Sequence, residues 1–274
     1  MQSRTVSAFQ TTQKSYDSIT ENSNSQDAIQ IFKFDEDTEK IIFYEDRLQL
    51  LKRDEIKDCK VCVISINGSY RTGKSFLLNF FLHYLRNKCE NVKEWMDVDD
   101  TLTPGFLWKS TVNRVTDGIF ICPEIFLTKT KKGEQIAIIL MDTQGTSDNR
   151  ASDTECSKIF ALSALISSVQ IYNLQKKLNS DDLKMLQLFT GYGAMFSESG
   201  HKPFQDLLIL IRDWIHPDEF DFGFEGGKEL LNSAFKNHKK SNLSEIQQII
   251  QGNFQNIRCF LMPNPKEKVE TKAF

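Results

Sequence analysis

The sequence predicts an α/β fold in which a doubly wound, mostly parallel sheet is flanked by helices. Short apolar runs of strand length alternate with segments of helical periodicity along the chain. A glycine-rich loop also follows an early apolar run, at residues 68–75, and in such sheets ligands bind at the carboxyl ends of the strands. With 274 residues, 40% of them hydrophobic, the chain can form one sizeable domain.

The amino-terminal residues divide into a tail and a first pair of strands. Residues 1–28 are rich in Ser, Thr, Gln and Asn, so we expect a disordered polar tail and assign the folded domain to residues 29–274. Alternating apolar side chains in Ile29–Phe34, followed by Ile41–Tyr44, predict a hairpin at the edge of the sheet.

The octamer from Gly68 to Ser75 matches the pattern G-x-x-x-x-G-K-[ST] of a phosphate-binding P-loop. It follows the β-branched run Lys60–Ile66 and precedes a segment of helical periodicity, so strand, loop and helix come in the required order. Gly68 and Gly73 leave the backbone N–H groups open to anionic oxygens. Lys74 then supplies charge for the β- and γ-phosphates, and the Ser75 hydroxyl is suited to Mg²⁺.

Arg71 is the unusual residue of this loop. A guanidinium at this place could reach across the phosphates as an arginine finger supplied in cis. It could equally be a solvated or salt-bridged surface arginine, and the residues alone leave both readings open.

A second buried strand is expected to end at the carboxylate that helps to bind Mg²⁺. Ile136–Met141 is an uninterrupted apolar run that ends at Asp142-Thr143-Gln144-Gly145, the D-x-x-G pattern of a switch. Asp142 would hold Mg²⁺ through water, and the amide of Gly145 would meet the γ-phosphate.

The segment between these two motifs is the candidate first switch. Thr116, just before the strand-like run Ile119–Cys122, is the best candidate for the hydroxyl that completes Mg²⁺ coordination and places the attacking water. Thr103 and Thr111 compete for this role, and an ordinary turn threonine is the alternative.

A third apolar run, Leu207–Ile211, ends at Arg212-Asp213. A carboxylate can accept hydrogen bonds from both N1–H and the 2-amino group of guanine, and adenine offers no such pair of donors. The pattern N-K-x-D of small GTPases is absent, so this dipeptide is either a shortened base-reading motif or a surface ion pair at a strand end.

Two helices are expected between the second and third motifs. Residues from Asp153 to Leu174 read as one long helix with an apolar face. Asn179–Asp182 then caps a further helix that runs through Phe189.

The net charge and the hydropathy of the sequence indicate whether the chain binds nucleic acid or spans a membrane. A net charge of -3 argues against an extended nucleic-acid surface. No apolar stretch reaches the roughly 18 residues of a membrane span, and no signal peptide opens the chain. We therefore expect a cytoplasmic location for this chain.

Taken together, the motifs resemble one family. The sequence is similar to the atlastins, dynamin-superfamily GTPases that fuse endoplasmic reticulum membranes, and more distantly to the guanylate-binding proteins. The resemblance covers about Ile41 to Phe274. It rests on the arginine-bearing P-loop together with the segments Gly105–Trp108, Met141–Thr146, Phe160–Ser163, Ile166–Ser168, Ile171–Leu174, Asp181–Leu183, Leu186–Thr190 and Ile211–Trp214.

The resemblance implies a role for each candidate residue. Arg71 becomes the cis arginine finger, Thr116 the switch threonine that binds the metal and takes part in catalysis, and Arg212-Asp213 the guanine-reading pair. Catalytic roles are implied for Arg71, Thr116 and Gly145, and metal roles for Ser75, Thr116 and Asp142. Nucleotide contacts are implied for Gly68, Arg71, Thr72, Gly73, Lys74, Ser75, Phe76, Gln144, Arg212, Asp213 and Val269, the last in a segment similar to the family's guanine cap.

The function implied is a Mg²⁺-dependent GTPase that binds GTP and GDP and pairs, as a homodimer or with a related GTPase, when nucleotide is bound. In a longer membrane-anchored protein the domain would lie on the cytosolic face of the endoplasmic reticulum. Asp117 stands where the family usually has a second threonine, and Lys272 where asparagine is common. These departures keep open a GTP-binding interaction module that hydrolyses little and lacks fusion activity, and, more weakly, an ATP-using enzyme. The sequence also leaves open whether the chain is a fragment with a truncated domain, an isoform or a shortened paralogue.

Overall fold

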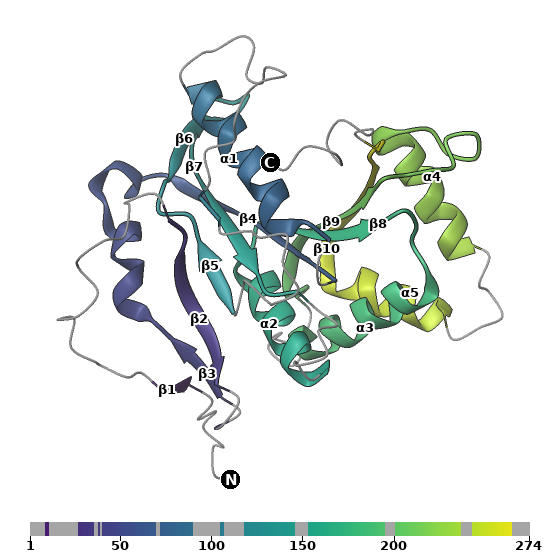
Figure 1. Cartoon of the computed structure of the whole chain (residues 1–274), viewed down its shortest axis with the longest axis horizontal. Coiled ribbons are helices and arrows are strands. Elements are labelled where there is room, and N and C mark those ends of the chain that lie inside the picture. The colour runs from purple at the N-terminus through teal and green to yellow at the C-terminus, as the bar shows by residue number, and fades with distance from the viewer. Residues whose placement is uncertain are drawn as a thin grey trace. The chain divides into compact units, whose positions relative to one another are not determined.

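The computed structural model describes residues 9–10, 27–35, 38, 40–69, 72–89, 105–106, 118–145, 153–194, 201–236 and 243–264. The chain forms two compact units. The first comprises residues 1–62 and 75–144, and the second comprises residues 63–74 and 145–274. Each unit is treated separately below (Figure 1).

Strands of the first unit pair mostly antiparallel, in the order β1-β3-β2-β5-β7. The hairpin of β2 (Ile29–Asp35) and β3 (Lys40–Phe43) confirms the expected one, and Phe32 stacks on Phe43 across it. The remaining strands are β1 (Phe9–Gln10), parallel to β3, and β5 (Ile119–Ile121) and β6 (Phe126–Lys129), both antiparallel to β7 (Gln135–Thr143). Two 3-10 helices, η1 (Glu45–Lys52) and η2 (Asp54–Ile56), follow β3.

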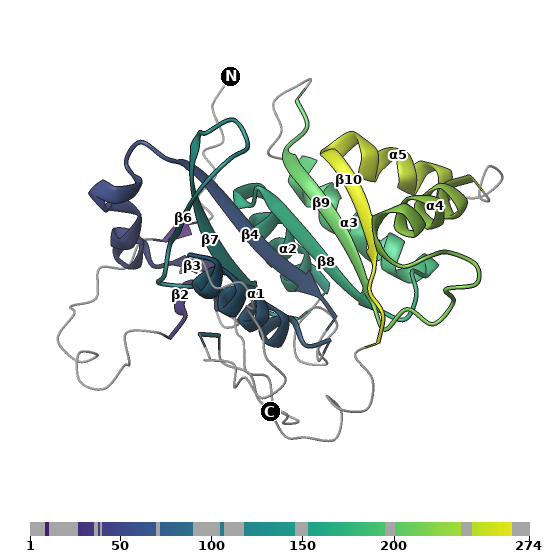
Figure 2. The same cartoon turned by 90° about the horizontal axis from the view of Figure 1, so that it is seen from above.

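The second unit contains the parallel sheet. Its strands run in the order β4 (Lys60–Gly68), β8 (Val169–Gln175), β9 (Phe204–Arg212) and β10 (Phe254–Leu261), and all three pairings are parallel (Figure 2). The predicted α/β class is thus confirmed. The strand pairing is mixed, because the pairs of the second unit are parallel and those of the first unit are mostly antiparallel. Because Gly68 pairs with Asn173, and Gln175 with Arg212, the carboxyl ends of three strands lie at one edge.

Helices α2 (Asp153–Ile166), α3 (Ser180–Ala194) and α5 (Leu243–Asn253) cover one face of this sheet, while α4 (Gly223–Lys236) packs along β10 (Figure 1). Phe160 of α2 stacks on Phe189 of α3 with ring centroids 4.3 Å apart, and both are fully buried. Burial of large aromatic and aliphatic side chains is the main stabilising contribution here. The core is built from Phe160, Tyr172, Leu186, Phe189, Phe204, Leu207, Ile209, Ile211, Ile250 and Phe254.

The expected single helix from Asp153 to Leu174 is wrong. Helix α2 ends at Ile166, where Ser167 Oγ donates to the carbonyl of Ser163, and β8 begins at Val169. β8 is mostly buried, but Gln170 and Asn173 stand among its apolar residues, so its sequence shows neither a continuous apolar run nor the strict alternation of a strand. The β-branched and aromatic residues of β8 were the signal for a strand.

The cap predicted for the next helix is confirmed. Asn179 Oδ1 accepts the N–H groups of Asp181 and Asp182, each at 2.9 Å, and Asp182 Oδ2 accepts the N–H of Asn179 at 2.9 Å. This reciprocal arrangement satisfies donors that the helix itself leaves unpaired. Within the described residues, no helix combines the length and apolar character needed to cross a membrane.

Candidate functional site

The phosphate loop begins where β4 ends, at Gly68. Its φ is +146°, and a Cβ at this position would lie 2.3 Å from the backbone oxygen of Asn173 in the neighbouring strand. The N–H of Gly68 donates to the side-chain oxygen of Asn67 at 2.9 Å. Only glycine fits this close approach without moving the backbone, so the first glycine of the motif is required by packing.

Lys74 lies inside the loop with only 7% of its surface exposed. Its ammonium donates to the carbonyl of Ser69 at 3.0 Å, and the Thr72 hydroxyl donates to the same oxygen at 2.8 Å. Gly73, which precedes the lysine, has φ +69°. The loop therefore turns back on itself around a buried cation, as a site for an anionic polyphosphate requires.

The carbonyl of Thr72 accepts two further hydrogen bonds from the adjacent strands. Asn173 Nδ2 donates at 3.0 Å, and a terminal nitrogen of Arg212 donates as well. Burial lowers the pKa of the Arg212 guanidinium, and the neighbouring carboxylate of Asp213 opposes this shift. In this structure Arg212 thus contacts the phosphate loop, at the carboxyl end of β9.

Asp213 has a left-handed backbone with φ +56°, and its carboxylate is held by two amides. Gln175 Nε2 donates to Oδ2 at 2.9 Å, and Asn264 Nδ2 donates to Oδ1 at 3.2 Å. Two carboxylate oxygens that already accept N–H donors are suited to the N1–H and 2-amino donors of guanine. The carboxylate belongs to the same unit as the phosphate loop.

The metal-side groups belong to the first unit. Ser75, in the first turn of α1 (Lys74–Cys89), donates its hydroxyl to Asp142 Oδ2 at 2.5 Å, and Oδ1 of Asp142 accepts the N–H of Thr143 at 3.0 Å. Asp142 is 2% exposed. A serine hydroxyl next to a buried carboxylate is an oxygen donor set that fits Mg²⁺, which takes few protein ligands and keeps several waters.

Gln144 joins the second switch motif to the end of the candidate first switch. Its N–H donates to the carbonyl of Gly118 at 2.9 Å, and its side-chain oxygen accepts the N–H of Gly118 at 2.8 Å. Gln144 is 1% exposed, and Gly145 after it is buried. Gln144 therefore forms hydrogen bonds with the backbone of Gly118, and its expected place near the nucleotide stays a prediction.

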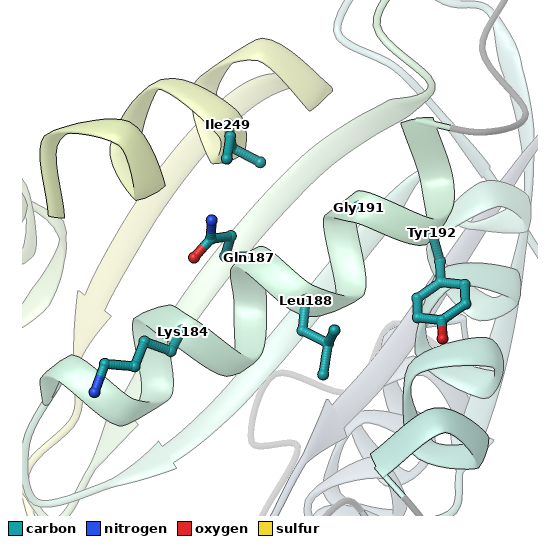
Figure 3. Close-up of a pocket in the computed structure, with 6 residues that line it drawn as sticks. All are labelled: Lys184, Gln187, Leu188, Gly191, Tyr192 and Ile249. Carbon is teal, nitrogen blue, oxygen red and sulfur yellow. The ribbon is translucent and has the colours of Figure 1, made fainter. Parts of the chain in front are cut away.

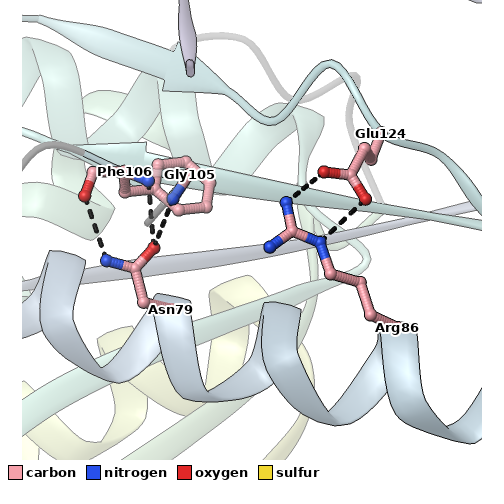
Figure 4. Close-up of polar contacts among 5 residues, drawn as sticks. All are labelled: Asn79, Arg86, Gly105, Phe106 and Glu124. Atoms are coloured by element: carbon pink, nitrogen blue, oxygen red, sulfur yellow. Dashed lines mark hydrogen bonds and ion pairs between the residues drawn. The ribbon is translucent and has the colours of Figure 1, made fainter. Parts of the chain in front are cut away.

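Asn79 makes a similar contact at the start of that segment, and sequence reasoning missed it. From α1, its side-chain oxygen accepts the N–H groups of Gly105 at 3.1 Å and Phe106 at 2.9 Å, and its amide donates to the carbonyl of Phe106 at 3.0 Å (Figure 4). Two turns later Arg86 pairs with Glu124 (Figure 4). The available signal was a single asparagine inside the otherwise apolar run from Phe76 to Leu82.

Asn173 was missed as well, although it was quoted as part of a family segment. It is a fully buried polar residue of β8, and buried polar groups normally have a structural or functional reason. Phe76 packs edge-on against Phe80 with ring centroids 4.9 Å apart, so its nucleotide contact stays a prediction. Arg71, Thr116 and Val269 lie outside the described residues, and their roles also stay predictions.

A hollow of about 510 Å³ lies elsewhere in the second unit, between α3 and α5 (Figure 3). None of the motif residues lines it, and its wall is mostly apolar, so it does not match an anionic ligand. It is lined by Lys184, Gln187, Leu188, Gly191, Tyr192 and Ile249.

Comparisons with known proteins agree with these motifs. The family model of the guanylate-binding protein N-terminal domain matches residues 38–274. The chain is 41% identical to Atlastin of Drosophila melanogaster over 250 residues, which is 89% of this chain and 46% of that protein. It is 40% identical to Atlastin-2 of Homo sapiens over 247 residues, and 41% identical to Atlastin-3 of Rattus norvegicus over 227 residues.

These alignments cover 89% and 81% of this chain, and 42% of each of the two mammalian relatives. The chain therefore spans less than half the length of the curated relatives that it matches. The expected resemblance is confirmed, since the matched region contains every motif described above. The chain belongs to the guanylate-binding protein family through its N-terminal domain, and within that family it is similar to the atlastins.

Proposed function

We propose that this chain is a Mg²⁺-dependent domain that binds and hydrolyses GTP. The observation that carries the proposal is the pairing, within one unit, of a phosphate loop around the buried Lys74 with the oriented carboxylate of Asp213. A buried cation among backbone amides favours a polyphosphate, and a carboxylate acceptor favours guanine over adenine. Family membership and the similarity to atlastins support the same reading.

Each group has a chemical task in this proposal. The loop and Lys74 neutralise and orient the β- and γ-phosphates. Ser75 and Asp142 would hold Mg²⁺, and the ion would shield the charge that develops on the phosphate oxygens. Thr116 places the attacking water, and the amide of Gly145 contacts the γ-phosphate. Arg71 acts as the finger in cis that stabilises the transition state.

We also propose that GTP promotes pairing of two such domains and that Arg71 turns onto the phosphates in the paired state. Membrane fusion at the endoplasmic reticulum would require a longer protein, of which this domain would be the cytosolic motor. The support is the similarity to proteins named atlastin, which are more than twice as long as the matched region.

Nucleotide binding by isothermal titration tests the base assignment. The wild type is expected to bind GDP at least about a hundredfold more tightly than ADP, because two hydrogen bonds to a charged acceptor contribute about 1.5–3 kcal/mol each. Asp213→Asn should reverse the preference toward xanthosine diphosphate, whose 2-oxo group accepts the new amide donor. An unchanged base preference in Asp213→Asn would favour an ATP-using enzyme instead.

A second candidate is a GTP-binding interaction module with little hydrolysis. The departure that favours it is Asp117, which stands where the family usually has a second threonine; a carboxylate close to the phosphates would repel their charge. Tight GTP binding with negligible turnover in the wild type, together with faster turnover in Asp117→Thr, would support this candidate over the first.

A further inference from the structure

We infer that Arg212 is a positioning residue of the phosphate loop and that Asp213 alone reads the base. The two residues are adjacent, and the family resemblance treats them as one guanine-reading pair. Their contacts in the structure divide them: Arg212 donates to the loop carbonyl of Thr72, whereas the carboxylate of Asp213 accepts from the side-chain amides of Gln175 and Asn264. The inference rests on the proposed binding of a guanine nucleotide.

The guanidinium of Arg212 is fitted to the loop. A Cβ on Gly73 would lie 3.4 Å from each of its two terminal nitrogens, so the guanidinium packs against the second glycine of the motif. Asn173 donates to the same Thr72 oxygen from the neighbouring strand. Two side chains from β8 and β9 therefore hold one carbonyl of the loop.

Holding this carbonyl also sets the direction of the next amide. In a planar trans peptide the C=O of Thr72 and the N–H of Gly73 point in opposite directions. When Arg212 and Asn173 draw the oxygen toward the strands, the N–H of Gly73 faces the other way. Loop amides that face a common centre are what a polyphosphate site needs, since oriented N–H groups bind anions without rearrangement.

The charge of Arg212 supports the same role. Its Nε is buried and has no hydrogen-bond partner in the part of the chain that the structure describes. A partly buried cation whose buried donor is unpaired is costly, and a polyphosphate bound in the adjacent loop would offset part of that cost. A guanidinium has only donors, so it cannot accept the N1–H and 2-amino groups that distinguish guanine.

The experiment compares three ligands by isothermal titration: GDP, inosine diphosphate, which lacks the 2-amino group, and GMP, which lacks the β-phosphate. Arg212→Gln is expected to weaken GDP and inosine diphosphate by one common factor of about ten to a hundred, the range for hydrogen bonds from a charged donor. Because the loop contributes less to a monophosphate, the loss for GMP should be smaller. The ratio of GDP to inosine diphosphate affinity should stay at its wild-type value.

Two further variants serve as matched comparisons. Asn173→Ala removes the other donor to Thr72 and should show the same pattern, with a smaller common factor of about five for a neutral hydrogen bond. Asp213→Ala should do the opposite and bring the ratio of GDP to inosine diphosphate affinity close to one. Arg212→Lys, which keeps the charge and loses the planar fork, should fall between Arg212→Gln and the wild type.

The outcomes separate the inference from the proposed function. If Arg212→Gln changes the ratio of GDP to inosine diphosphate affinity as Asp213→Ala does, Arg212 reads the base and the inference is wrong, while GTP binding stands. An equal loss for GMP and GDP would also contradict it. If the wild type binds no guanine nucleotide, the proposed function fails at once. Should Arg212→Gln unfold, judged by circular dichroism, Arg212→Lys and Asn173→Ala decide the question.

Discussion

Asn79 offers the most direct test of how α1 is joined to the backbone at Gly105 and Phe106. The side chain is fully buried and makes three hydrogen bonds to two consecutive residues. Asn79→Leu removes all three and leaves two N–H groups and one carbonyl without their partner. At about 1 kcal/mol for each bond, we expect a loss of about 3 kcal/mol in the free energy of unfolding.

Thermal unfolding followed by circular dichroism measures this loss. A change of 1 kcal/mol moves the melting temperature by about 2–4 °C for a chain of this size class, so Asn79→Leu should melt roughly 6–12 °C below the wild type. Asn79→Asp keeps the oxygen that accepts both N–H groups and loses only the donor to Phe106, so its melting temperature should be intermediate. The control is Asn232→Leu, because Asn232 is exposed on α4 and surface changes stay within about 0.5 kcal/mol.

An Asn79→Leu melting temperature equal to that of Asn232→Leu would refute this reasoning. It would mean that water or a relaxed backbone replaces the three bonds at no cost. The same result for Asn79→Asp and Asn79→Leu would show that the donor to Phe106, and not the shared acceptor, determines the stability.

Three other predictions follow from single contacts. Gly68→Ala should abolish nucleotide binding and destabilise the fold by about 2–4 kcal/mol, since its Cβ meets the Asn173 backbone at 2.3 Å; an unchanged urea midpoint would count against the loop geometry. Ser75→Ala should keep GDP binding and remove its enhancement by Mg²⁺, measured by titration with and without EDTA, and a persisting Mg²⁺ effect would reject the metal assignment. Burial raises the pKa of Cys122 to about 11 and of Cys259 to about 12, from 9.0. These thiols keep their protons longer in the folded state, so stability should fall as the pH rises above 9.0 and fall less in Cys122→Ala; identical pH profiles would contradict this.

Much of the fold followed from local patterns. The strand before the octamer, the run that ends at Asp142 and the cap at Asn179 each carry a signal within a few residues, because periodicity and capping act over one element. The prediction of one helix from Asp153 to Leu174 was wrong because the buried strand β8 mixes Gln170 and Asn173 with its apolar residues and so lacks the alternating pattern of a strand.

The residues of the candidate site also differ in how far the sequence could predict them. Lys74, Asp142 and Asp213 could be proposed as site residues because each stands in a short contiguous sequence pattern, and their roles stay predictions. The contacts of Asn79 and Asn173 could not, because each joins segments far apart in sequence: Asn173 meets Thr72 from β8, and Asn79 meets Phe106. Single asparagines carry no spacing rule, and only the folded backbone brings their partners within reach.

Steady-state release of phosphate from GTP, measured over a range of protein concentrations with Mg²⁺ present, tests the central proposal most directly. We expect turnover well above that of Lys74→Ala, with a rate per molecule that rises with protein concentration as domains pair. We also expect Arg71→Ala to remove most of that turnover while GDP still binds. Phosphate release no faster than that of Lys74→Ala at every concentration would contradict the proposed GTPase.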